Sequence, residues 1–177
     1  METFEIKSQE ELEKFKDEYG YYVNGNLEAD CSLIIEKRLK VDGYLFIKAG
    51  WSIKAGGFIE AGGSIEAGES IEAGGSIEDG ESIEGGESIE AGGSIEAGES
   101  IKAGGSIEAG WSIEAGESYG ISAELSITCK TTLSFGLNAY AGIKTWGEAT
   151  EEEKTISCGK LIKGNVEYGI LKETGKS

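Results

Sequence analysis

One hexapeptide repeats without interruption through the middle of the chain. From Trp51 to Ser118 the sequence follows Ser-Ile-Glu-Ala-Gly-x, where x is mostly Gly or Glu and is Trp at two positions. Isoleucine recurs every six residues, at positions 53, 59, 65, 71, 77, 83, 89, 95, 101, 107 and 113. Because six is an even number, the repeat preserves the two-residue alternation of a strand and does not fit the turn of a helix. It therefore predicts short strands, each followed by a bend at the Gly-x pair, where glycine permits unusual backbone angles.

The same alternation extends beyond the repeat. Apolar residues keep the odd-numbered positions from about Val23 to Ile143, and Cys31 and Cys129 fall on this inward set. Identical six-residue steps without hairpin turn sequences favour a parallel β-solenoid over a stack of hairpins. The residue at x recurs best after three hexads, which favours a coil of three hexads over a flattened coil of two. The sequence thus predicts an all-β, three-sided parallel β-solenoid of about seven coils, spaced by roughly 4.8 Å.

The two ends of the chain depart from the repeat. Ser8 and Glu11 are spaced as a helix capping box, and an apolar stripe follows, so we expect a short capping helix over roughly residues 9–19. After an acidic loop, Thr155–Cys158 and Val166–Leu171 flank a Lys-Gly-Asn turn and predict a terminal β-hairpin. The expected organisation is a cap at 1–22, a solenoid at 23–146 and a tail at 147–177.

Composition narrows the possible functions. The chain of 177 residues contains no histidine, so it lacks imidazole bases, histidine-activated nucleophiles and the usual zinc ligands. Its three cysteines form no CxxC pair, no calcium-loop or phosphate-loop motif is present, and we expect no catalytic residue, metal or cofactor. The net charge of −17 disfavours direct binding to nucleic acids or anionic membranes. We expect a soluble, cytoplasmic protein.

The repeat resembles a known group of proteins. The Ser-Ile-Glu-Ala-Gly steps are similar to the short repeats of bactofilins and, more distantly, to the hexapeptide-repeat left-handed helices. The left-handed group carries a small residue two places before its aliphatic residue, whereas here the small alanine lies two places after isoleucine. We therefore favour a right-handed coil. The overall style also resembles small acidic solenoid proteins encoded by phages, which implies no particular activity.

The acidic charge is concentrated on the regular repeats. Residues 51–118 contain fifteen acidic residues and two lysines, a balance of −13, while residues 119–177 balance at zero. A coil of three hexads would stack the glutamates into ladders whose neighbours repel one another. The ladders and two tryptophans at the outward x position form the candidate binding surface: Glu60, Glu78, Glu96, Glu114, Glu72, Glu90, Glu108, Glu81, Glu99, Glu117, Trp51 and Trp111.

Two interpretations of the ladders stay open at this point. The glutamates would keep a small rod soluble and prevent lateral association, as charged faces usually do. Alternatively, rigid rows of carboxylates would imitate a nucleic-acid backbone and occupy a basic groove, which in a phage setting points to a host nuclease or a CRISPR effector. The tryptophans would then either lie over a neighbouring coil or anchor the partner. We expect a non-enzymatic monomer or homodimer; the alternative is a self-assembling structural protein like the bactofilins.

Overall fold

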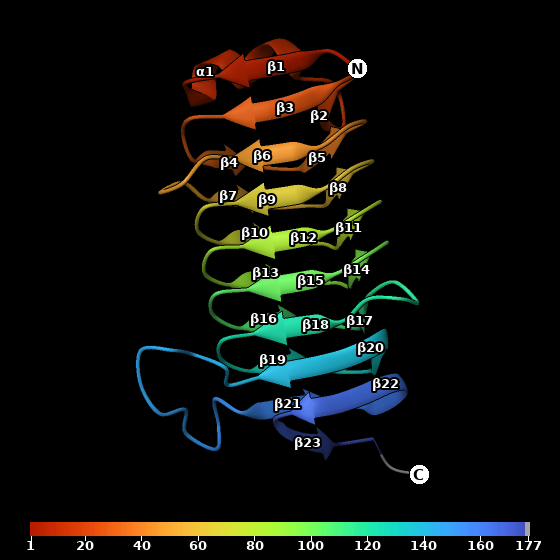
Figure 1. The fold of residues 1–177 in the computed structure, drawn as a ribbon. Coiled ribbons are helices and arrows are strands. Elements are labelled where there is room, and N and C mark those ends of the chain that lie inside the picture. Colours follow the sequence, from red (N-terminus) through yellow and green to blue (C-terminus); the bar gives the residue numbers. More distant parts are fainter. Residues whose placement is uncertain (176–177) are drawn as a thin grey trace.

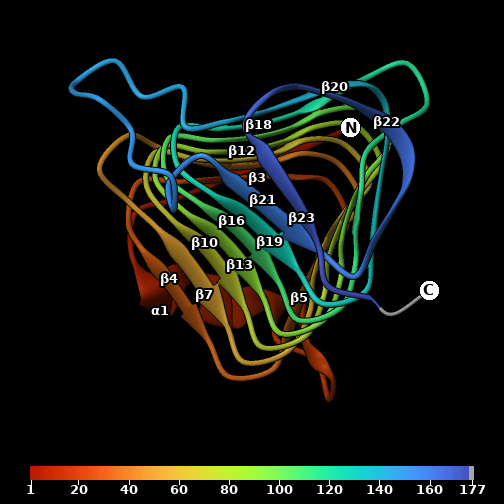
Figure 2. The ribbon, with the colours of Figure 1, turned by 90° about the horizontal axis from the view of Figure 1, so that it is seen from below.

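The chain winds into a three-sided rod of stacked coils. The computed structural model describes residues 1–175, which form about nine coils of about 18 residues (Figure 1). A view along the rod shows its triangular outline (Figure 2). Strands on each side pair in parallel with the strands one coil above and below. The predicted parallel β-solenoid and its period of three hexads per coil are confirmed. The coils number about nine rather than seven, because strands in the predicted cap and tail also belong to the solenoid.

Each side of the rod is a ladder of short strands, and we number the sides as faces I, II and III. Face I consists of β1 (Thr3–Ile6), β3 (Asn26–Ala29), β6 (Leu45–Ile47), β9 (Ile65–Ala67), β12 (Ile83–Gly85), β15 (Ile101–Ala103) and β18 (Ile121–Ala123). Face II consists of β4 (Leu33–Ile35), β7 (Ile53–Ala55), β10 (Ile71–Ala73), β13 (Ile89–Ala91), β16 (Ile107–Ala109), β19 (Ile127–Cys129), β21 (Thr155–Cys158) and β23 (Ile170–Glu173).

Face III is the third side and shares its last strands with face I. It consists of β2 (Gly20–Val23), β5 (Arg38–Val41), β8 (Ile59–Ala61), β11 (Ile77–Asp79), β14 (Ile95–Ala97) and β17 (Ile113–Glu114). The longer strands β20 (Thr132–Ala141) and β22 (Lys160–Tyr168) cross from face III to face I and pair with each other in parallel.

The core runs along the axis of the rod. The repeat isoleucines stack directly upon one another, as Ile71 does upon Ile53 and Ile89, and all of them are buried. Where a coil is longer, it gains two residues, so that Leu33 lies beside Ile53 and Ile107 beside Ile127. Because two is even, these insertions keep the same side chains pointing inward.

Some predicted inward positions are instead exposed at irregular segments. Tyr119, Leu137 and Ile143 lie in or beside the longer connections and face solvent. The segment between β20 and β21, residues 142–154, leaves the rod as a loop (Figure 1). This loop shifts the alternation by one, and the inward residues of β21 are therefore the even-numbered Ile156 and Cys158.

The N-terminal cap is present but shorter than predicted. Helix α1 spans Gln9–Leu12 and continues as a 3₁₀ turn over Glu13–Phe15, whereas the sequence predicted a helix to residue 19. The helix ends because the Asp17 carboxylate accepts the backbone N–H groups of Tyr19 and Gly20, both at 2.7 Å, and reverses the chain. The capping box is also incomplete: Ser8 makes no side-chain cap bond, while Glu11 accepts the N–H of Lys7 at 2.9 Å.

The predicted C-terminal hairpin is wrong. Thr155–Cys158 is a strand, and the second predicted segment supplies the end of β22 and the start of β23. However, β21 pairs with β23 in parallel, with Thr155 beside Ile170 and Cys158 beside Glu173. The glycine at 164 lies inside β22, so the Lys-Gly-Asn sequence does not reverse the chain. The tail therefore continues the solenoid, because its apolar residues complete the stacks of the coils above.

Candidate protein-binding surface

Face III carries the longest ladder of glutamates. Glu60, Glu78, Glu96 and Glu114 are register partners on successive strands, and neighbouring strands are about 4.8 Å apart. Lys40 lies one coil above and forms an ion pair with Glu60. Within residues 1–175, none of the other three carboxylates has a lysine or arginine within ion-pair distance. Partial burial, together with the charges of its two neighbours, raises the pKa of Glu96.

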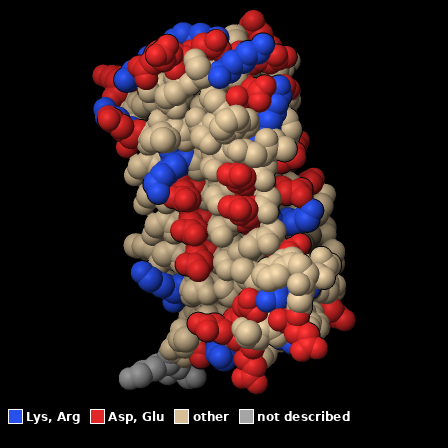
Figure 3. All heavy atoms as spheres, turned by 90° about the vertical axis from the view of Figure 1, so that its left-hand side faces the viewer, with Lys and Arg blue, Asp and Glu red and all other residues tan. Residues whose placement is uncertain are grey.

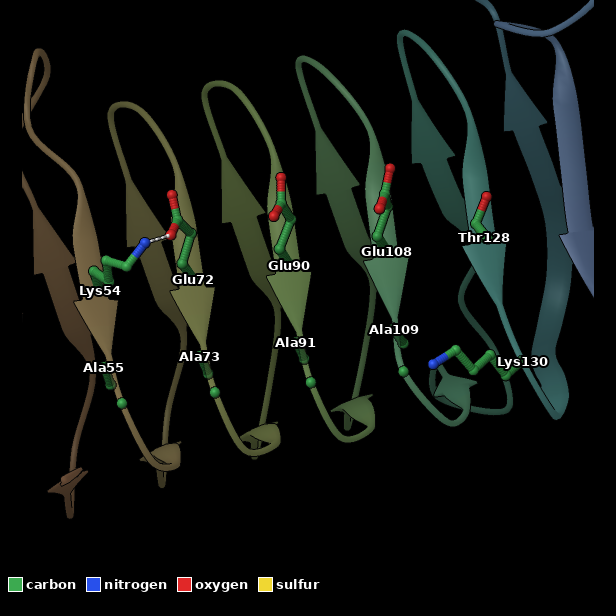
Figure 4. A pocket seen from close by; sticks show the side chains of 14 residues that line it. Lys54, Ala55, Glu72, Ala73, Glu90, Ala91, Glu108, Ala109, Thr128 and Lys130 are labelled. Atoms are coloured by element: carbon green, nitrogen blue, oxygen red, sulfur yellow. Dashed lines mark hydrogen bonds and ion pairs between the residues drawn. The ribbon is translucent and has the colours of Figure 1, made fainter. Parts of the chain in front are cut away.

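Face II carries a second ladder beside a shallow groove. Lys54 forms an ion pair with Glu72, and Glu90, Glu108 and Thr128 follow in register down the face (Figure 4). The groove has a volume of about 540 Å³ and an alanine and glycine floor, and its lining extends from Lys54 to Lys130. Its carboxylates line one flat surface, because every strand contributes the same residue to it.

Face I carries a ladder that other residues interrupt. Its outward register positions are occupied in turn by Glu5, Glu28, Phe46, Glu66, Glu84, Lys102 and Ser122. Lys102 forms an ion pair with Glu84 and so neutralises the lower part of the ladder. Faces II and III therefore carry unbroken runs of three and four glutamates, whereas Phe46 and Lys102 interrupt the run on face I. Figure 3 shows the acidic atoms as vertical columns along one side of the rod.

The corner between faces II and III is bare of large side chains in the middle coils. Gly74 and Gly92 turn this corner in successive coils, and a Cβ atom on either would collide with the carbonyl oxygen of the glycine one coil above. Glycine is thus required by the close stacking of the backbone. As a result, the two acidic ladders flank a corner of glycine and serine in the middle coils, with the exposed Phe58 at its upper end and Trp111 at its lower end.

The corner between faces III and I carries the third predicted column. Glu81 and Glu99 stack there through a backbone hydrogen bond, and Gly116, next to Glu117, continues the column. Ser64 and Ser82 donate hydroxyl hydrogen bonds to Glu81 and Glu99 at 3.0 and 3.4 Å. These contacts hold two carboxylates near the corner, so face III presents an acidic ladder with an acidic border.

The two tryptophans do not meet. Trp51 begins the column that continues to Glu69, between faces I and II. Trp111 follows Gly93 in the column between faces II and III. Their exposed fractions are 41% and 67%, so both are accessible, and Trp111 alone lies on the edge between the acidic ladders. The structure therefore assigns them to separate surfaces.

Asp79 is a feature that the sequence analysis did not single out. It occupies the inward position that Ala61 and Ala97 occupy in the adjacent coils. One carboxylate oxygen accepts the N–H of Glu81, while the other is buried without a hydrogen-bond partner in the structure. Burial raises the pKa of Asp79 to about 7. An aspartate replacing alanine in an otherwise regular repeat is the signal that would have found it.

The cysteines belong to the core rather than to a site. Cys129 and Cys158 are buried, and Cys31 is half-buried. Burial, with a smaller contribution from Cys158, raises the pKa of the Cys129 thiol to about 12, which keeps it protonated. In the described part of the chain, no group of three or more acidic or cysteine side chains is arranged to hold a metal ion. None of its helices has the length and apolar character needed to cross a membrane.

Comparison of the chain with protein-family models, with curated proteins and with solved structures finds no match. The functional argument therefore rests on the geometry of the acidic faces.

Proposed function

We propose that this protein is a non-enzymatic binding protein whose acidic faces II and III dock onto a basic protein surface that otherwise binds nucleic acid. The observation that carries the proposal is the in-register stacking of unpaired carboxylates on two adjacent faces. A single nucleic-acid strand carries one charge per roughly 3.4 Å, and a ladder with a rung about every 4.8 Å approaches that density.

The placement of the lysines supports the same proposal. Lys40 and Lys54 pair with the first glutamates of the two ladders, and Lys163 pairs with Glu117 near the other end at 3.3 Å. The carboxylates between them have no basic partner among residues 1–175. Lysines at outward positions would neutralise the glutamates of a ladder, as Lys102 neutralises Glu84 on face I. The middle of the ladders on faces II and III contains no such lysine. The acidic surface is thus framed by lysines at its ends and free of them at its centre.

A rigid surface of this kind would gain affinity in two ways. The strands that carry its carboxylates are fixed before binding, so that little backbone entropy is lost on association. Its field would steer a basic partner and make association fast and sensitive to salt. In a phage setting, the natural partner of such a surface is a host defence nuclease or a CRISPR effector, which it would inhibit by occupying the nucleic-acid groove.

The proposal is tested by removing one ladder while matching the charge elsewhere. The triple variant E78Q/E96Q/E114Q removes the unpaired part of the face III ladder. The control E2Q/E18Q/E148Q removes the same charge from exposed positions outside the ladders. Circular dichroism should show both variants folded, because all six side chains point outward.

Binding partners are captured from bacterial lysate at about 50 and 500 mM salt, and a purified partner is then titrated with fluorescent duplex DNA. We expect a basic nucleic-acid-binding protein to be retained at low salt and DNA to displace it. The ladder variant should bind at least about tenfold more weakly and the control within about threefold. Equal binding by the ladder variant, or a partner that binds DNA and this protein at once, would refute the proposal.

A further inference from the structure

The two ends of the rod differ in how far their end strands are covered. At the N-terminal end, α1 and the 3₁₀ turn cover the first coil, and Leu12 and Ile6 are buried. The side chain of Gln9 accepts the N–H of Ile34 at 2.9 Å and so occupies a free edge of face II. Residues Lys16 and Tyr21 pair as an antiparallel bridge beside β2. Another strand cannot add to the edges of faces II and III without displacing these contacts, while the four-residue β1 remains the end strand of face I.

The C-terminal end has no such cover within residues 1–175. Strand β23 is the last strand of face II and pairs only with β21, while β22 pairs only with β20. No residue from Gly159 to Gly175 is buried, although Leu161, Val166 and Leu171 occupy the inward positions of this last coil. Leu171 stacks under the buried Ile156 and is 38% exposed. The core of the rod is therefore open at this end.

The open end also presents unpaired backbone groups. The N–H groups of Ile170 and Thr174 donate upward to Lys154 and Cys158 at 2.7 and 2.8 Å. Because backbone groups alternate in direction along a strand, those of Leu171 and Glu173 face away from the rod. Together, β22 and β23 offer thirteen residues of edge, about 40 Å in length, to another chain.

From these observations we infer that the C-terminal coil is a self-association surface, and that two copies of the chain stack end to end through it as a twofold dimer. Charge favours a second copy over other occupants. The last coil carries three lysines and two glutamates between Gly159 and Gly175, so two such ends do not repel each other. The N-terminal cap, residues 1–22, carries seven acidic residues and three lysines, and the middle of the rod is more acidic still.

The sequence of β23 is self-complementary about one residue. A twofold axis through Leu171 places Leu171 opposite the same residue of the second copy, where the two can exchange a pair of backbone hydrogen bonds. The same register sets Ile170 opposite Lys172, so both outward positions avoid like charges. Because a twofold contact uses the same surface of both copies, it closes on itself and gives a dimer rather than a filament.

The test is the mass of the purified protein across a concentration series. Sedimentation velocity from about 1 to 200 µM should show the 18.7 kDa chain converting to a species of twice that mass. L171E places two carboxylates against each other at the axis and should weaken the dimer at least about tenfold. L137E is the control, because Leu137 is 57% exposed on β20, outside the last coil. It should dimerise like the parent chain.

Three results would overturn the inference. The first is a chain that stays monomeric to the highest concentration, which would leave the open edge to a strand of another protein. The second is L171E dimerising as strongly as the parent, and the third is growth beyond a dimer, which would indicate head-to-tail stacking. None of these measurements uses a basic partner, so the result stands apart from the proposed function.

Discussion

The regular middle of the rod and its last coil follow the same inward pattern but differ in what surrounds their cores. In the middle, each isoleucine lies between two others, and the outer surface is strongly acidic. In the last coil, the inward residues have a neighbour on one side only, and the surface is almost neutral. The comparison teaches that one inward pattern can leave an acidic surface along the sides of the rod and a nearly neutral, open strand edge at its end. We propose a charged partner for the sides and a second copy of the chain for the end.

The largest difference is expected for core truncation. I95A should lower the free energy of unfolding by about 2–5 kcal/mol, because Ile95 is fully buried between two coils. L171A should cost less than about 1 kcal/mol in the monomer, because Leu171 is already partly exposed. Urea unfolding at about 1 µM protein measures both. Equal losses of unfolding free energy for I95A and L171A would show that the last coil is as well covered as the middle of the rod. That result would contradict the contrast drawn above.

A second prediction concerns Asp79, the half-buried aspartate at an inward position of the middle coils. The folded-state pKa of Asp79, about 7, lies above the usual value of 3.8. Between these values the folded protein retains a proton that the unfolded chain releases, so stability falls as the pH rises from about 4 to 7. D79A should therefore stabilise the protein by about 2–4 kcal/mol at pH 8 and by much less at pH 5.

Thermal unfolding of the parent and of D79A across this pH range provides the measurement. The outward glutamates are retained in both proteins, so they serve as an internal control for the general effect of acid. An unchanged gap between the two proteins at pH 5 and pH 8 would mean that Asp79 is not held in a buried, charge-disfavouring environment.

The smallest expected effect comes from repulsion on the acidic faces. E78Q/E96Q/E114Q should raise the stability by about 1 kcal/mol at low salt, because it removes contacts between neighbouring carboxylates. The gain should shrink by more than half at about 500 mM salt. E167Q, in the nearly neutral last coil, should change stability little at either salt concentration. A salt-independent gain would point to packing rather than charge.

Much of this fold could be predicted because its information is local. The six-residue period fixes which side chains point inward, and the recurrence of the variable residue indicates three hexads per coil, so the register of Glu72 with Glu90 followed from sequence. The tail was mispredicted because Lys-Gly-Asn is a plausible turn locally, while the pairing of β23 with β21 depends on a long-range fit to the coil above.

The candidate surface was predicted in part for the same reason. The three ladders, including the place of Lys102 beside Glu84, follow from the period, because their members are 18 residues apart. The pairing of Lys40 with Glu60 did not follow, because that coil is longer by two residues. The burial of Asp79 depends on how much room its neighbours leave, which no pattern of residue types specifies.

The central claim is that carboxylates separated by three hexads of sequence stack directly upon one another. It is tested by spin-label pairs at positions 72 and 90 and at positions 72 and 84, in a chain whose three native cysteines are replaced. We predict strong dipolar broadening for the first pair, whose backbones are about 5 Å apart on adjacent strands, and weak broadening for the second, which lies on different faces. Strong broadening for the 72–84 pair, with little for the 72–90 pair, would indicate a coil of two hexads and contradict the account.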